Sequence, residues 1–72
     1  MFKNISEAPL DELVILRKDF LGIETPLVVV GEITTFKGKI HHLWRGGYEA
    51  AIDTYKKLNP EWDEKFDSFC EL

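Results

Sequence analysis

The fold of this chain is decided by residues 25–45, which read TPLVVVGEITTFKGKIHHLWR. The first half is rich in Val, Ile and Thr, which favour strands, and the second half returns after Lys37 and Gly38. Glycine accepts the positive φ of a tight turn, so we expect two antiparallel strands, Thr25–Phe36 and Lys39–Arg45. A two-residue turn and a three-residue loop with a bulge both fit, and their registers differ by one residue. The cross-strand partners therefore stay open.

Two helices are expected after this hairpin. In residues 48–58, five side chains fall at helical spacing and two lysines lie near the end. Asn59-Pro60-Glu61 then resembles a second helix start, with an N-cap side chain, a proline and an acid. The second helix would dock through one apolar stripe. The first helix face is Tyr48, Ala51, Ile52, Tyr55 and Leu58, and the second is Trp62, Phe66, Phe69 and Cys70.

Residues 10–21 fit two descriptions. As a helix they place six apolar side chains on one face and end before Gly22, whereas as a strand Leu13–Arg17 is an apolar run short enough for the centre of a sheet. Periodicity slightly favours the helix. The six side chains are Leu10, Leu13, Val14, Leu16, Phe20 and Leu21.

Residues 5–11, Ile-Ser-Glu-Ala-Pro-Leu-Asp, resemble the opening of many small uncharacterised phage proteins. In those proteins an Ala-Pro-basic-Asp-Gly segment leads into a first strand. Here Leu10 replaces the basic residue and Glu12 stands where the pattern has glycine. The resemblance implies a strand after residue 11 and a viral origin, and it brings no activity or site residues. We expect a single α+β domain over residues 1–72, in which a small antiparallel sheet, a hairpin or three strands, packs against two C-terminal helices.

The charge is unevenly distributed along the chain. The total of −4 divides into −3 for residues 1–36, +3 for residues 37–57 and −4 for residues 58–72. A basic centre favours an anionic ligand or partner, whereas the acidic tail argues against direct nucleic-acid binding. At 72 residues a single core barely offsets chain entropy, so a homo-oligomer is an open alternative.

The single cysteine, Cys70, cannot form an internal disulfide, which favours a cytoplasmic location, the host cytoplasm if the chain is phage-encoded. The N-terminal residues have no apolar core of a signal peptide, and Leu27–Val30 is too short to span a membrane. Neighbouring strand residues point to opposite faces, so His41 and His42 cannot share a metal ion. We expect no membrane contact, no metal and no cofactor.

One corner of the chain has the composition of an anion site. Lys39, His41 and Arg45 share one face of the second hairpin strand, and the backbone amides of Gly47 and Tyr48 follow at a helix start. Tyr48 or an edge-exposed Trp44 could stack on a base, which would make the corner a nucleotide site. The alternative is that Trp44 belongs to the core over Gly31 and that His42 is half-buried and hydrogen-bonded.

The acidic C-terminal segment is a second candidate surface. On the expected final helix, carboxylates would face a basic host protein, as in a DNA mimic or an anti-defence inhibitor. The candidate residues are Glu61, Asp63, Glu64 and Asp67. No nucleophile lies predictably near either histidine, so we expect no enzyme. The predicted function is a non-enzymatic phage-type binding protein that sequesters a nucleotide-like anion or inhibits a host protein by occupying it.

Overall fold

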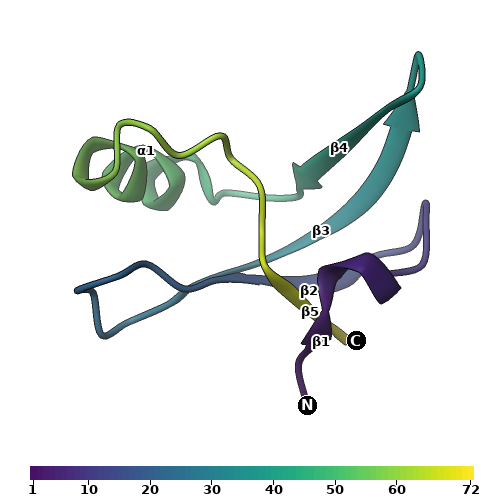
Figure 1. Ribbon diagram of the computed structural model, residues 1–72, viewed down its shortest axis with the longest axis horizontal. Helices are drawn as coiled ribbons and strands as arrows, with labels where there is room; N and C mark the ends of the chain where they lie inside the picture. Colours follow the sequence, from purple (N-terminus) through teal and green to yellow (C-terminus); the bar gives the residue numbers. More distant parts are fainter.

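The computed structural model describes residues 1–72 and shows one antiparallel sheet of five strands with a single α-helix (Figure 1). The elements in chain order are β1 (Lys3–Asn4), a 3₁₀ turn η1 (Ile5–Glu7), β2 (Val14–Lys18), β3 (Leu27–Phe36), β4 (Lys39–Trp44), α1 (Glu49–Leu58) and β5 (Ser68–Glu71). The only α-helix is α1, with ten residues, and none of the helices has the length and hydropathy of a membrane-spanning segment.

The strands are ordered β1-β5-β2-β3-β4, so the last strand in the chain lies between β1 and β2. β2 occupies the middle and pairs on one side with β3, Leu16 opposite Val29, and on the other with β5, Leu16 opposite Phe69. The helix and the segment that follows it lie over one face of the sheet, which we call the inner face (Figure 1). We call the opposite face the outer face.

The hairpin is confirmed, and it uses the two-residue turn. Lys37 and Gly38 have φ values of 51° and 75°, which is the left-handed pair of a type I′ turn, and Phe36 faces Lys39. This register places Trp44 directly opposite Gly31 on the inner face. The interpretation of Trp44 as a residue packed against the core over Gly31 is therefore confirmed.

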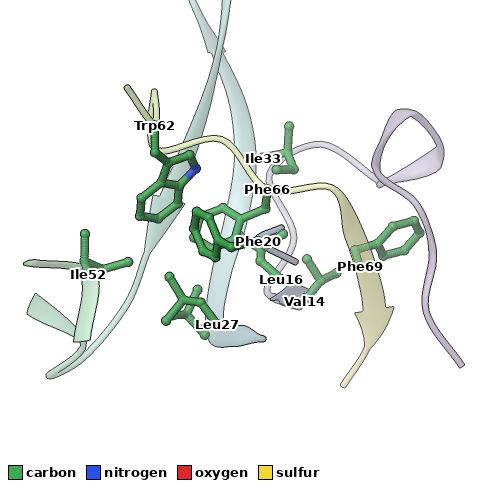
Figure 2. Close-up of a cluster of buried hydrophobic side chains, with 10 residues drawn as sticks. Val14, Leu16, Phe20, Leu27, Ile33, Ile52, Trp62, Phe66 and Phe69 are labelled. Carbon is green, nitrogen blue, oxygen red and sulfur yellow. The ribbon is translucent and has the colours of Figure 1, made fainter. Parts of the chain in front are cut away.

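The core lies between the inner face and the covering segments (Figure 2). Alternate residues of β2 and β3 point inward, as period-two strands require, and Ile52 is the one fully buried side chain of α1. Three aromatic rings close the space above the sheet, with Phe20 stacked on Tyr55 and edge-on to Trp62. The ten core residues are Val14, Leu16, Phe20, Leu27, Val29, Ile33, Ile52, Trp62, Phe66 and Phe69.

The expectation of two C-terminal helices is wrong. The first is present as α1, but residues 59–67 form an irregular segment and residues 68–71 form β5. Asp63 accepts a hydrogen bond from the amide of Lys65 (3.1 Å), and Glu64 has a φ of 62°, a left-handed conformation that ends any helical turn. Trp62, Phe66 and Phe69 are buried as expected, while Cys70 lies on the outer face beside Ile15.

Residues 10–21 adopt the strand alternative. Val14–Lys18 is the central strand of the sheet, and Val14 and Leu16 are fully buried. The helix alternative would have buried Leu10 and Leu21, which are both exposed. Ahead of the strand, Asp11 takes a φ of 62° and its amide donates to the carbonyl oxygen of Ile33 (2.8 Å). Asp11 therefore forms a left-handed turn at the position where the phage proteins that this segment resembles have the Asp of their Asp-Gly pair.

Candidate functional site

The β3–β4 hairpin projects beyond the part of the sheet that α1 covers (Figure 1). Its end, residues 35–41, is exposed at every position, and we call these residues the hairpin tip. Phe36 is 63% exposed although it is a large aromatic residue. Exposed aromatic side chains at the end of a projecting element are typical of contact surfaces, because they offer large apolar area at little cost in side-chain entropy.

A shallow hollow of about 330 Å³ lies on the outer face at the base of this tip. The rings of Phe36 and His41 meet edge to face across its wall, with centroids 6.3 Å apart. Thr34, the cross-strand partner of His41, donates from its hydroxyl to a carboxylate oxygen of Asp11 (2.6 Å). The hollow is open and largely apolar, so it suits a protruding apolar or planar group. Its lining residues are Thr34, Thr35, Phe36, His41 and Leu43.

The hairpin tip carries two cations that the fold itself does not use. Five ion pairs occupy other cationic groups, and Lys37 and Lys39 belong to none of them. The Lys37 ammonium lies 5.4 Å from the centre of the Phe36 ring, a cation–π contact that keeps the charge beside the exposed aromatic surface. The tip therefore combines positive charge with apolar area.

The residues predicted as an anion site are divided between two places. Lys39 and His41 lie at the hairpin tip, whereas Arg45 lies six residues further along the chain than Lys39, about 20 Å away at strand spacing. The Arg45 guanidinium forms an ion pair with Glu32, whose side chain is only 14% exposed. Trp44 faces the inner side, away from His41.

The glycine corner offers fewer free amides than its sequence indicates. The Tyr48 amide donates to the carbonyl oxygen of Gly46 (2.7 Å), so it is already used, and Glu49 stands in the first turn of α1. A carboxylate at that position already interacts with the positive end of the helix dipole. Gly47 and Tyr48 are thus separated from the cations of the tip and are followed directly by an acidic residue.

The acidic residues of the C-terminal segment take part mainly in internal contacts. Asp67 binds the Lys18 ammonium (3.1 Å) and the amide of Asp19 (3.3 Å), and Glu64 pairs with Lys56 (3.2 Å). Asp63 holds the turn at Lys65 described above. Of the four predicted partner-binding acids only Glu61 has no such contact, and the helix that was to display them together is not formed.

His42 fixes the 59–67 segment to the sheet. Its Nδ1 accepts a hydrogen bond from the amide of Phe66 (2.9 Å), and the two rings stack at 6.2 Å. The neutral ring therefore carries its proton on Nε2. Burial lowers the pKa of His42 below its usual 6.5, Lys65 lowers it further, and Asp63 partly opposes the shift. The expectation of a half-buried, hydrogen-bonded His42 is confirmed, and its ring points away from exposed His41.

Stability is expected to fall with acid because of this histidine. The unfolded chain takes up a proton near pH 6.5, whereas the folded chain resists it, so the free energy of unfolding decreases as pH drops below about 6.5. The slope is at most about 1.4 kcal/mol per pH unit for one group. His42→Asn keeps an acceptor near the Nδ1 position but does not titrate.

Urea unfolding between about pH 5.5 and pH 8 would measure this slope, above the range in which ordinary carboxylates titrate. His42→Asn should flatten it, while His41→Asn, at an exposed position of the same strand, should leave it unchanged. If the free energy of unfolding depends on pH equally in His42→Asn and His41→Asn, groups other than His42 cause the pH dependence.

The apolar members of the site were not identified from sequence. Phe36 and Leu43 lie on the outer face with His41, and the hairpin register, which the sequence left open, decides which of these side chains are neighbours. The run Leu27–Val30 indicated that β3 has apolar side chains on both faces, but it did not point to Phe36 or Leu43. Comparison of the chain with models of protein families, with curated proteins and with solved structures finds no match in any of the three.

Proposed function

We propose that this protein is a non-enzymatic binding protein that occupies an anionic surface of a partner protein with its hairpin tip. The observation that carries the proposal is the projection of Phe36, 63% exposed, between two lysines that have no ion-pair partner. Aromatic anchors flanked by charge are the groups that dominate protein–protein contacts. The lysines supply attraction and orientation, and the ring and the hollow supply apolar contact.

Occupancy rather than catalysis is proposed because the hollow is open to water and its hydroxyl at Thr34 is already bonded to Asp11. Reactions that require proton transfer gain from a closed, dry site with a base aimed at the reacting atom. The resemblance of residues 5–11 to phage proteins leads us to propose a bacterial host protein as the partner and a cytoplasmic location. Inhibition would follow from covering the acidic surface of that partner.

Two matched pairs of variants test the hairpin tip. Lys39→Glu and Phe36→Ser should each reduce capture of the partner from bacterial lysate by at least about tenfold, because charge contacts and a central aromatic anchor are both lost. Lys57→Glu repeats the charge change on α1, and Leu58→Ser removes an apolar residue that is also 63% exposed. Both controls should capture as the wild type does, and capture should weaken with salt.

A small nucleotide-like anion is the second candidate, favoured by the hollow with two rings beside the lysines. A nucleotide that binds the folded chain would raise its melting temperature, and Lys39→Glu would abolish the rise. If no nucleotide shifts the transition and the four variants capture the same proteins equally, the tip is not the binding surface.

A further inference from the structure

The outer face of the sheet has an apolar centre that no helix or further strand of the chain covers (Figure 1). Across three neighbouring strands, Cys70 lies beside Ile15 and Ile15 lies opposite Val30. Val28, on the same face of β3, is 43% exposed, and Leu43 on β4 is 42% exposed. An antiparallel sheet whose second face meets water normally carries polar side chains there. In this chain the inner face and the outer face are both apolar at the middle of the sheet.

We propose that the outer face of a second copy of this chain covers this surface, giving a two-fold symmetric dimer. A two-fold interface brings the same patch of both copies together, so the patch must not repel itself. The charged groups at the borders of the apolar centre are paired within the chain, Arg45 with Glu32 and Arg17 with Asp19. No unpaired side-chain charge therefore lies at the apolar centre, although the chain carries a net charge of −4. The unpaired Lys37 and Lys39 lie away from it at the hairpin tip, and the N-terminal ammonium lies at its edge, 3.8 Å from Cys70 Sγ.

The acids that produce this negative charge lie largely elsewhere. Glu49 and Asp53 belong to α1, and four more acids belong to the segment between α1 and β5, which covers the inner face (Figure 1). Two copies that meet through their outer faces thus keep their most acidic parts far apart. A strongly charged partner would find no complementary charge on the apolar centre, which favours a second copy as the occupant.

The available area suits a weak, transient dimer. The strands β2 to β5 contain 25 residues, each covering about 16 Å² of the plane of a sheet, or about 400 Å² in all. The chain exposes 5036 Å², whereas a compact monomer of 8.4 kDa is expected to expose about 4600 Å². Specific interfaces of small size bury up to about 600 Å² on each partner. We therefore expect the dimer to dissociate on dilution.

Sedimentation of the full chain from about 1 µM to about 500 µM tests the proposal, since such interfaces dissociate in this range. The mass should rise from the 8.4 kDa of one chain to twice that value. Higher salt should leave the dimer unchanged or strengthen it, because apolar contact holds it. A single chain mass at every concentration would overturn the proposal, whatever else covers the face.

Two variants disrupt the outer face while keeping the fold. Val28→Glu places an acid opposite Arg17, and Leu43→Lys places a cation opposite Glu32, so each new charge has a neighbour of opposite sign. Each should shift the midpoint of dimerisation at least about tenfold higher in concentration, because a charge is buried in the interface. Circular dichroism and melting temperature would report that both variants remain folded.

Leu58→Glu and Leu21→Lys make the same changes at exposed apolar positions outside the outer face and should dimerise as the wild type does. Equal dissociation in these controls, or unchanged dimerisation in the outer-face variants, would contradict the proposal. Leu43 also lines the hollow at the base of the hairpin tip, whereas Val28 does not, so Val28→Glu is the variant that separates the two proposals. Capture of a partner by the hairpin tip weakens with salt and depends on Lys39 and Phe36. Either result can therefore fail while the other holds.

Discussion

Replacing Gly31 with alanine is expected to destabilise the protein more than any other single-methyl change. Gly31 lies on the inner face of β3, directly opposite Trp44. A Cβ atom at this position would collide with the backbone carbonyl oxygen of Leu43 and lie 2.9 Å from Cδ1 of Leu16, a side chain with no exposed surface. The carbonyl belongs to the β3–β4 ladder, so it cannot move aside without opening the hairpin.

We expect Gly31→Ala to lose about 3 kcal/mol or more, the upper range for overpacking a core. The whole free energy of unfolding of a chain of this size is about 4–11 kcal/mol. The melting temperature should therefore fall by about 12–24 °C, which calorimetry or circular dichroism would measure. Gly47→Ala is the matched control, because no atom lies within 4 Å of the Cβ that it adds. A similar melting temperature for the two variants would show that the strands separate easily at Gly31.

Replacing Trp62 with alanine is the second large effect we expect. The indole ring packs edge-on against Phe20 (5.2 Å between centroids) and Phe66 (5.7 Å), and its Nε1–H donates to the carbonyl oxygen of Lys65 (2.8 Å). Figure 2 shows Trp62 beside Phe20 and Phe66, so its removal should leave a cavity against these two rings and free the segment that carries Phe66. Truncations of this kind cost about 3–5 kcal/mol.

Urea unfolding would measure this loss, with two variants for comparison. Trp62→Phe keeps a ring but loses the hydrogen bond, so we expect it to cost about 1 kcal/mol. Phe36→Ala removes a ring that is 63% exposed and should change stability by no more than about 0.5 kcal/mol. If Trp62→Ala is as mild as Phe36→Ala, the aromatic cluster does not anchor the segment.

Sequence patterns predicted the features that depend on near neighbours. The hairpin and α1 follow from β-branched residues, a glycine at the turn and helical spacing, and all of these act over a few residues. The choice of turn was open because Lys37 is disfavoured with positive φ, at about 1–2 kcal/mol. The hydrogen bonds between β3 and β4 in the two-residue register offset this cost. They depend on both strands together, so a local sequence pattern does not reveal them.

The C-terminal segment shows why the remainder could not be predicted. Trp62, Phe66 and Phe69 have helical spacing, yet an irregular turn followed by a strand buries the same three rings. The amide of Phe66 binds His42 instead of a carbonyl oxygen four residues earlier. The candidate site changed for a similar reason, because the pairing of Arg45 with Glu32 depends on the tertiary fold and the exposure of Phe36 depends on how far the hairpin projects beyond α1 (Figure 1).

The place of β5 in the sheet also governs how the chain reaches its native state. The β3–β4 hairpin closes a loop of two residues and forms within microseconds, whereas β5 must bring Phe69 beside Leu16 across most of the chain. Pairings so distant in sequence slow folding. Until β5 inserts, β1 has no neighbour and β2 has an unpaired edge that invites association with other unfolded chains. The yield of folded protein thus depends on whether β5 inserts into the sheet faster than the unpaired edge of β2 associates with other chains.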